Sequence, residues 1–298
     1  MFKNTIKFTK MNGLGNDFII VDGKDVTEVT DSHAAASPLL RMTIYSQLAK
    51  KMCDRNFGIG ADGLIIVNPT DVKADTDISW RIFNSDGTEP QMCGNGIRCF
   101  AKYVYEKGLI NKKKFTVWTL AGTITPEILD NGEVRVDMGK PILEAKKVPV
   151  NVEDLDCVIN YPFELEGKDF YITAVSMGNP HCIIFTDEDS ALLARKYGSK
   201  IEIHTMFPEK TNVEFVKILS RNNIKIDVWE RGCGITLACG TGACASTVAA
   251  ILNELTDNTV KADLPGGSLI IEWNKEMPDS SVFMTGKADF VFEGEYYL

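Results

Sequence analysis

Two short cysteine–glycine segments, one in each half of the chain, constrain the fold and function of this sequence more than any other feature. They are Cys93-Gly94-Asn95-Gly96 and Cys239-Gly240-Thr241-Gly242. Each precedes a stretch whose apolar spacing predicts a helix, over residues 97–106 and 243–255. Because glycines allow a tight turn with bare amide N–H groups, each sulfur is expected at a helix N-terminus.

The helix end determines the chemistry expected of such a thiol. Unpaired N–H groups and the helix dipole favour negative charge there, so a thiol whose ordinary pKa is about 8.5 ionises more easily. The same amides can hold a carboxylate. Two such thiols at one pocket would place a proton acceptor on one face of a carbon and a proton donor on the other. A racemase or an epimerase needs this arrangement.

Length and composition exclude several classes of protein. A chain of 298 residues with 44% apolar residues is long enough for two domains. Its formal net charge of −9 leaves no broad positive field for nucleic acid. Residues 1–11 lack the apolar core of a signal peptide, and no later stretch is long enough to span a bilayer. We therefore expect a cytoplasmic protein with no membrane partner, whose eight cysteines are reduced.

Short strand-like runs separated by turns occur along the chain and helical stretches are fewer, which predicts an α+β architecture. Examples of the expected strands are residues 63–67, 79–83 and 224–229, and the expected helices cover 39–53, 97–106, 189–197 and 243–255.

The order of motifs indicates a duplicated unit. Gly15-Asn16 and the apolar run after it are echoed by Gly178-Asn179 and a second apolar run, and each half then reaches its cysteine–glycine segment. Glycine, proline and mixed charge place the domain boundary within residues 138–150, and residues 25–37 are expected to form a flexible surface connection.

Three other uses of the cysteine segments compete with catalysis. A lone cysteine is most often a small core residue, but packing requires neither the cysteines nor the repeated glycines. Zinc would pair Cys93 with Cys99 or Cys239 with Cys244, at spacings wider than or at the margin of a usual knuckle. Phosphate binding would need a Lys-Ser/Thr pair that neither turn has. The remaining cysteines are expected in the cores, namely Cys53, Cys99, Cys157, Cys182, Cys233 and Cys244.

A set of polar residues embedded in apolar or turn sequence suggests a ligand site. One asparagine in such a place normally caps a turn. Several of them, with an adjacent acid and base, suit a ligand that carries both ammonium and carboxylate groups. The set comprises Asn16, Asn84, Asn179, Asn212 and the pair Glu230-Arg231.

These segments together resemble the diaminopimelate epimerase family, and they cover nearly the whole chain in the family's order. The matching stretches are KMNGLGNDF at 10–18, FNSDG at 83–87, MCGNGIRC at 92–99, MGNPHC at 177–182, ERG at 230–232, ACGTGA at 238–243 and DLPGG at 263–267.

The resemblance implies an enzyme that interconverts LL- and meso-diaminopimelate in lysine and peptidoglycan precursor synthesis, with no cofactor and no metal. Cys93 and Cys239 become the two acid/base thiols, and His181 takes a secondary role in tuning a thiol. The backbone amides at 94–95 and 240–241 hold the carboxylate at the reacting carbon. The implied substrate contacts are Asn16, Asn84, Gly94, Asn95, Asn179, Asn212, Glu230, Arg231, Gly240 and Thr241.

The resemblance also implies a fold and an assembly. Each of two pseudo-symmetric domains is a barrel-like sheet around a central helix, the active site lies in the cleft between them, and the protein is a homodimer. Residues 1–137 with 287–298 form the half that carries Cys93, and residues 138–286 form the half that carries Cys239.

Two positions depart from the family pattern, and two rival functions remain. Gly63 stands where the family often has a substrate-contacting glutamine, and Ile235 stands where a glutamate is common before Thr236. The nearest rival is a racemase of another amino acid such as proline, which belongs to the same superfamily. The remote rival is a non-catalytic protein that binds zinc or another small ligand.

Overall fold

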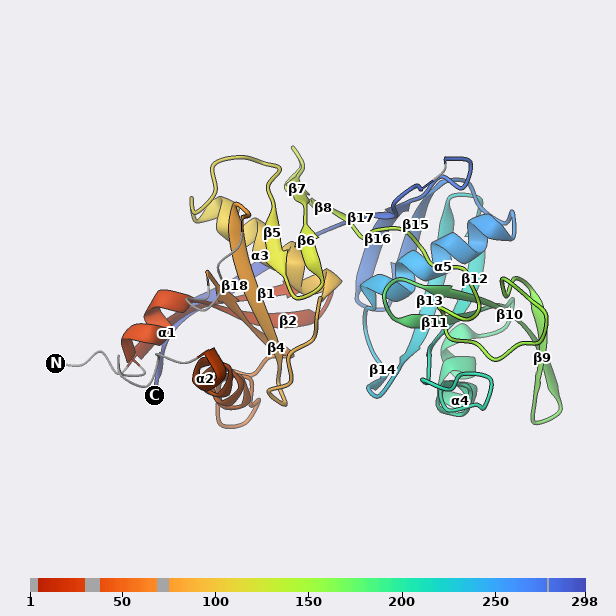
Figure 1. Cartoon of the computed structure of the whole chain (residues 1–298), viewed down its shortest axis with the longest axis horizontal. Coiled ribbons are helices and arrows are strands. Elements are labelled where there is room, and N and C mark those ends of the chain that lie inside the picture. The colour runs from red at the N-terminus through yellow and green to blue at the C-terminus, as the bar shows by residue number, and fades with distance from the viewer. Residues whose placement is uncertain (1–4, 30–37, 69–74, 278) are drawn as a thin grey trace. The chain divides into compact units, whose positions relative to one another are not determined.

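The computed structural model describes residues 5–29, 38–68, 75–277 and 279–298. Its internal contacts divide the chain into two units (Figure 1): unit 1 comprises residues 1–136 and 286–298, and unit 2 comprises residues 137–285. Each unit combines a sheet with a few helices, which confirms the predicted α+β architecture.

Unit 1 is built on a seven-stranded sheet in the order β18-β1-β2-β3-β4-β5-β6. The strands are β1 (Thr5–Gly13), β2 (Asn16–Asp22), β3 (Gly63–Val67), β4 (Ile78–Asn84), β5 (Val117–Thr119), β6 (Gly122–Ile124) and β18 (Asp289–Tyr297). A hairpin of β7 (Pro126–Ile128) and β8 (Val134–Asp137) follows β6. The helices are α1 (Gly23–Val29), α2 (Pro38–Met52) and α3 (Gly94–Glu106).

Helices cover both faces of this sheet. On one face, Leu64 and Ile66 pack in a buried cluster with Leu48 of α2. On the other face, the Trp80 ring meets the Phe100 ring of α3 edge to face, with centroids 5.5 Å apart. Figure 1 shows α3 on the side of β1 and β2 opposite to α1 and α2. Because helices cover both faces, every residue of β3 is buried. This explains why its sequence is apolar throughout instead of alternating between apolar and polar residues.

Unit 2 has its own sheet, which contains the strand order β17-β16-β15-β13-β12-β11-β10-β9. Its strands are β9 (Tyr161–Leu165), β10 (Lys168–Ser176), β11 (Pro180–Phe185), β12 (Asn212–Ser220), β13 (Asn223–Glu230), β14 (Gly234–Ile235), β15 (Thr259–Leu264), β16 (Gly267–Glu272) and β17 (Phe283–Gly286). The helices are α4 (Ser190–Glu202) and α5 (Gly240–Leu252).

The two sheets repeat one pairing scheme. In unit 1, β1–β2 is antiparallel, β2–β3 parallel, β3–β4 antiparallel, β4–β5 parallel and β5–β6 antiparallel. In unit 2, β10–β11, β11–β12, β12–β13, β13–β15 and β15–β16 follow the same sequence of orientations. Helix α3 precedes β5 as α5 precedes β15. The predicted duplication is therefore confirmed at the level of topology.

The structure corrects two expectations from the sequence. Residues 23–29 form the helix α1, whose Val26 is 1% exposed in the core, although residues 25–37 were expected to be a flexible connection. The rest of that stretch, residues 30–37, lies outside the described residues. Cys233 is exposed and Cys157 is partly exposed, although both were expected in a core. Cys233 lies in a turn between Gly232 and Gly234, which both have positive φ.

The helices offer no membrane span. Within the part of the chain that the structure describes, none is both long enough and apolar enough to cross a bilayer.

Candidate active site

Cys93 is the N-cap residue of α3, as the glycines after it predicted. Its backbone is extended, and the amide of Gly96 donates a hydrogen bond to its sulfur at 3.4 Å. The side chain is partly exposed. A sulfur in this position takes the place that a hydroxyl or carboxylate usually occupies at a helix N-terminus.

Two asparagines fix which atoms surround this sulfur. The guanidinium of Arg98 donates to Asn95 Oδ1 at 2.9 Å, so the Asn95 amide nitrogen donates to Asn16 Oδ1 at 3.3 Å. Asn16 in turn donates its own amide to Asp62 Oδ2 at 2.7 Å. Because a carboxylate only accepts and a guanidinium only donates, both amide orientations are determined. The Asn16 oxygen therefore faces Cys93 Sγ, at 3.9 Å, as an acceptor.

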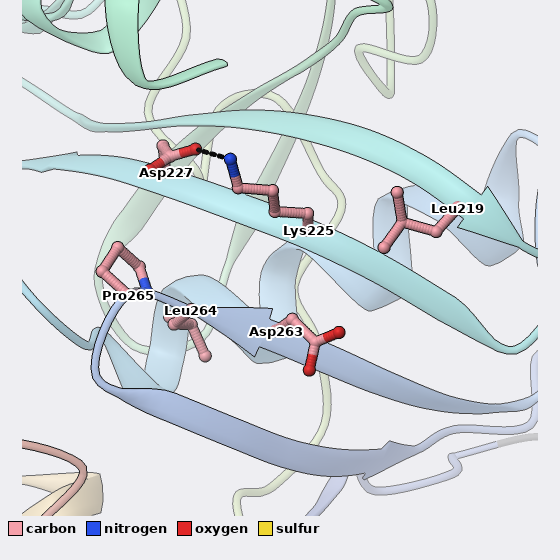
Figure 2. Close-up of a pocket in the computed structure, with 6 residues that line it drawn as sticks. All are labelled: Leu219, Lys225, Asp227, Asp263, Leu264 and Pro265. Carbon is pink, nitrogen blue, oxygen red and sulfur yellow. Dashed lines mark ion pairs between the residues drawn. The ribbon is translucent and has the colours of Figure 1, made fainter. Parts of the chain in front are cut away.

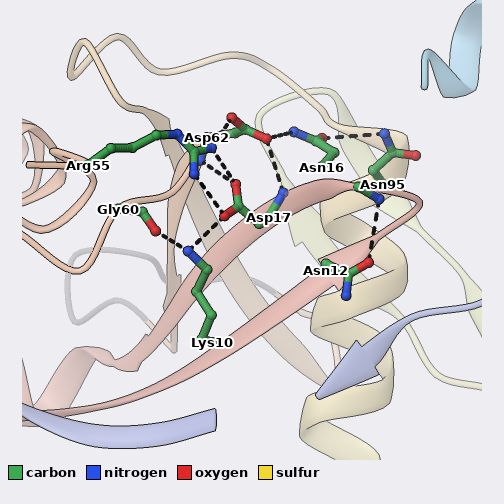
Figure 3. Close-up of polar contacts among 9 residues, drawn as sticks. Lys10, Asn12, Asn16, Asp17, Arg55, Gly60, Asp62 and Asn95 are labelled. Carbon is green, nitrogen blue, oxygen red and sulfur yellow. Dashed lines mark hydrogen bonds and ion pairs between the residues drawn. The ribbon is translucent and has the colours of Figure 1, made fainter. Parts of the chain in front are cut away.

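An ion-pair network holds Asp62 in place (Figure 3). Arg55 contacts both Asp17 and Asp62 at 2.8 Å, and Lys10 Nζ lies 2.7 Å from Asp17. The backbone amides of Asp17 and Asp62 each donate to the other's carboxylate at 3.0 Å. Burial opposes ionisation of Asp17, but hydrogen bonds from Arg55 and Lys10 outweigh it and lower the Asp17 pKa to about 2. The two positive charges of Lys10 and Arg55 thus balance the two negative charges of Asp17 and Asp62.

Cys239 is the N-cap residue of α5 and repeats the backbone arrangement of Cys93. The amide of Gly242 donates to its sulfur at 3.4 Å. The Thr241 hydroxyl lies 3.5 Å from the same sulfur. Unlike Cys93, Cys239 is 5% exposed.

Burial reverses the expected ionisation of Cys239. Desolvation raises the pKa of this thiol well above its usual range, and the charges of Glu230 and Glu214 raise it further. Hydrogen bonds from Thr241 and Gly242 favour the thiolate, but they are the smaller effects. The helix end by itself is therefore not enough to make this thiol easy to ionise. Burial also raises the pKa of Glu230, whose carboxylate accepts a hydrogen bond from the Thr236 hydroxyl.

A second polar network reaches Cys239 through Thr241. The Asn179 amide lies 3.3 Å from the Thr241 hydroxyl, and the Asn179 oxygen lies 3.1 Å from His181 Nε2. The other ring nitrogen, His181 Nδ1, lies 2.7 Å from Glu214 Oε1. Both His181 and Glu214 are completely buried.

The remaining predicted residues are placed as follows. Asn84 ends β4, is exposed, and donates to the Thr88 hydroxyl at 3.0 Å. Asn212 is 3% exposed, and its side chain donates to Pro180 O and accepts from the Arg231 backbone amide. The exposed Arg231 side chain donates to Glu209 O at 3.1 Å.

Of the two departures from the family pattern, Gly63 has a local explanation and Ile235 has none in the structure. A Cβ at Gly63 would lie 2.9 Å from the Phe83 carbonyl oxygen and 3.3 Å from the Phe18 ring, so a larger side chain has no room beside this backbone. Ile235 lies on β14, opposite Trp229, with 47% of its surface exposed.

Several residues of these networks were missed from the sequence, among them Glu214, Arg98 and Asp62. Glu214 interrupts the apolar strand 213–216, and a charged residue in such a strand is itself a signal. Arg98 is likewise fully buried inside a helix. Asp62 directly precedes the apolar strand β3 without being part of its pattern.

A surface depression elsewhere in unit 2 contains none of the predicted site residues (Figure 2). It is lined by Leu219, Lys225, Asp227, Asp263, Leu264 and Pro265. Lys225 and Asp227 form an ion pair at 3.4 Å within it.

Among the described residues the site contains neither a disulfide nor a cluster of metal ligands. No disulfide joins the eight cysteines, all of which lie in the described residues. Over that same part of the chain, no three His, Cys, Asp or Glu side chains are grouped to hold a metal ion.

Comparison with known proteins gives a consistent result. A family model described as diaminopimelate epimerase matches residues 8–144 and 173–291. The diaminopimelate epimerase of Carboxydothermus hydrogenoformans is 52% identical over 294 residues, covering 98% of this chain and 100% of that protein. That of Desulfitobacterium hafniense is 48% identical over 293 residues, covering 97% of each.

Solved structures share the fold at low sequence identity. A hydroxyproline epimerase from Agrobacterium vitis, with bound trans-4-hydroxy-L-proline, has a TM-score of 0.65 at 12% identity and covers 100% of this chain and 94% of its own. A Bacillus anthracis phenazine biosynthesis protein of the PhzF family has a TM-score of 0.63 at 16% identity and covers 98% of each chain. These similarities support the fold alone.

Proposed function

We propose that this chain, which belongs to the diaminopimelate epimerase family, interconverts LL- and meso-diaminopimelate with Cys93 and Cys239 as its two acid/base groups. The observation that carries the proposal is the repetition of one cysteine geometry. Each thiol is an N-cap residue whose sulfur accepts an amide hydrogen bond at 3.4 Å. Two equivalent thiols are what a reaction that runs in both directions requires.

The proposed reaction transfers one proton to the enzyme and one from it. A thiolate removes the α-hydrogen, so a Cα–H bond breaks and an S–H bond forms. The helix-end amides at 94–95 and 240–241 hold the substrate carboxylate and stabilise the negative charge that develops next to it. The opposite thiol then donates its proton to the other face of the carbon. Each turnover therefore exchanges the thiol and thiolate states of the two cysteines.

Charged side chains support an amino-acid substrate. Glu230 carries a partly buried carboxylate that suits an ammonium group, and the exposed guanidinium of Arg231 suits a carboxylate. We assign Asn16, Asn84, Asn179 and Asn212 to the same binding role. Asn16 and Asn179 act beside the sulfurs, whereas Asn212 acts through the backbone that it holds.

Single-thiol variants in deuterated water test the proposal. We expect the wild-type protein to incorporate solvent deuterium at the α-carbon during turnover, because the donated proton comes from an exchangeable thiol. Cys93→Ala and Cys239→Ala should each lower kcat by ~10²–10⁴-fold, the usual contribution of general acid–base catalysis. Cys157→Ala is the matched control, since Cys157 belongs to neither network, and it should retain full activity. Full epimerisation by either single-thiol variant would refute the two-base proposal.

Substrate choice has a direct test as well. Purified protein offered LL-diaminopimelate, L-proline and hydroxyproline should epimerise only the first. Turnover of proline at a comparable kcat/KM would favour the rival racemase function.

We infer from family membership that the enzyme is a cytoplasmic homodimer. Sedimentation equilibrium should give twice the chain mass of 33.0 kDa, and cell fractionation should recover the protein with the cytoplasm. A monomer at catalytic concentrations would contradict the dimer.

A further inference from the structure

Four contacts in unit 2 connect a buried carboxylate to the sulfur of Cys239. They run from Glu214 Oε1 to His181 Nδ1 at 2.7 Å and from His181 Nε2 to Asn179 Oδ1 at 3.1 Å. They continue from Asn179 Nδ2 to Thr241 Oγ1 at 3.3 Å and from Thr241 Oγ1 to Cys239 Sγ at 3.5 Å. All four distances are within the range of hydrogen bonds to oxygen, nitrogen or sulfur.

The structure makes room for this carboxylate at the helix end. A Cβ at Gly242 would lie 2.7 Å from Glu214 Oε1, so only glycine lets the carboxylate approach the first turn of α5. The positive end of the helix dipole favours a negative charge there. Glu214 Oε2 is buried with no hydrogen-bond partner among the described residues, so the pairing with His181 is its main polar contact.

The structure gives one direction to the hydrogen bonds of this chain. The Asn179 amide nitrogen donates to Thr241 Oγ1, so the Asn179 oxygen is the atom that faces His181 Nε2 and accepts its hydrogen. Because Thr241 Oγ1 accepts from Asn179, the Thr241 hydroxyl hydrogen is left to point at Cys239 Sγ. Glu214, 2.7 Å from the other ring nitrogen, holds the imidazole in this orientation.

We propose that Glu214, His181, Asn179 and Thr241 form a relay that turns the Thr241 hydroxyl hydrogen to Cys239 and so stabilises its thiolate. Glu214 and Thr241 are positioning residues in this relay. The proposal rests on the proposed function, because only a thiol that acts as a thiolate base gains from a hydrogen-bond donor held in this direction. Charges of Glu230 from β13 and Glu214 from β12 act on Cys239, and His181 from β11 acts on Glu230.

Nitrogen NMR of the histidine rings tests the relay without an activity measurement. The chain has three histidines, so ring signals of a ¹⁵N-histidine-labelled protein are few and His181 can be assigned by its loss in His181→Phe. Cys239→Ala should shift the His181 ring signals in the wild-type background and leave them nearly unchanged in a Thr241→Val background. Cys93→Ala, the matched control in the other unit, should leave them unchanged in both. Equal shifts in the two backgrounds, or none in either, would overturn the relay.

Kinetics supply the second measurement. Thr241→Val keeps the shape of the side chain but loses the hydroxyl, so we expect kcat to fall about tenfold with KM within about twofold, the effect of one charge-assisted hydrogen bond. Thr241→Ser should restore kcat to within about twofold of wild type. If Thr241→Val keeps its kcat, the hydroxyl does not serve the thiol and the relay is wrong. An enzyme inactive on diaminopimelate whose His181 signals still respond through Thr241 would refute the proposed function and leave the relay standing.

Discussion

The surroundings of the two cysteines differ although their backbones agree. Both sulfurs cap a helix at 3.4 Å from the amide three residues on. In unit 1 the neighbouring side-chain atom is the Asn16 oxygen, an acceptor whose orientation Asp62 determines. In unit 2 it is the Thr241 hydroxyl, which can donate or accept. Duplication has therefore kept the helix end that each cysteine caps, while the side chains around the two sulfurs have diverged.

Strand register locates the origin of this divergence. Phe18 and Ile20 on β2 pair with Gly63 and Ile65 on β3, as His181 and Ile183 on β11 pair with Asn212 and Glu214 on β12. The buried pair His181–Glu214 thus corresponds to Phe18 and Ile65. Under the helix end, a Cβ at Gly96 would meet the Ile82 side chain at 3.0 Å, whereas one at Gly242 would meet Glu214. The first turn of α3 therefore packs against an apolar side chain, and the first turn of α5 packs against a carboxylate.

The largest effect is expected when the charge of unit 2 is copied into unit 1. Ile65→Glu places a carboxylate among buried apolar side chains with Phe18 in place of a histidine. We expect a loss of about 4 kcal/mol in unfolding free energy, because a buried charge without a partner is costly. Hydrogen–deuterium exchange should show faster opening of β2 and β3, with unit 2 as the internal control. Adding Phe18→His should recover part of the loss, and protection equal to wild type in Ile65→Glu would contradict the apolar environment.

The reverse exchange should cost less. His181→Phe and Glu214→Ile each remove one partner of a buried pair, and each should lower the unfolding free energy by about 3 kcal/mol. The double variant, which recreates the unit 1 pair, should lose much less than the sum, because no polar group is then left unpartnered. Urea denaturation of the four proteins measures this coupling. Additive losses would mean that the two side chains do not stabilise each other.

Acid should weaken unit 1 through Asp17. Its pKa in the folded protein is about 2, below its ordinary 3.8, so the carboxylate stabilises the fold at pH values above 3.8. This contribution, about 2 kcal/mol from the size of the shift, is lost as the pH falls from the ordinary value through the folded one. The stability difference between wild type and Asp17→Asn should therefore shrink between pH 5 and pH 2. A difference that stays constant with pH would show that Asp17 does not hold its charge through Arg55 and Lys10.

The smallest effect concerns the amide that faces Cys93. In Asp62→Asn the new side chain can also donate, so only the longer contact with Asn95 still holds the Asn16 amide and its nitrogen can turn to the sulfur. We expect Cys93 to be alkylated about fivefold faster at neutral pH, the effect of about 1 kcal/mol of hydrogen bonding. Site-resolved mass spectrometry compares it with Cys239 in the same sample, whose rate should not change. An unchanged Cys93 rate would mean that Asp62 does not determine the Asn16 orientation.

Local sequence predicted the parts of the site that depend on local chemistry. Glycines after each cysteine predicted the helix starts, and the structure begins these helices at Gly94 and Gly240, three residues earlier than their apolar spacing indicated. The raised pKa of Cys239 was not predictable in this way, because it depends on burial and on Glu214 and Glu230 from two other strands.

The networks behind the cysteines depend on long-range pairing. His181 meets Glu214 only because β11 and β12 lie parallel in one register, across 33 positions of sequence. Asn16 meets Asp62 across 46 positions for the same reason. Helix α1 was missed because Val26 is the one buried apolar side chain among its residues of described burial, too little for a periodic pattern.

The pairing of β18 with β1 has a consequence for biosynthesis. Residues 289–297 form one edge of the unit 1 sheet, and the carbonyls of Lys287 and Ala288 accept hydrogen bonds from Arg98 and Lys102 of α3. A ribosome makes this segment only after all of residues 137–285. Unit 2 is one continuous stretch of the chain, so nearly all of it is made before the last strand of unit 1 begins. Unit 1 is completed last, and the Cys93 helix gains its contacts with Lys287 and Ala288 only when synthesis is nearly over.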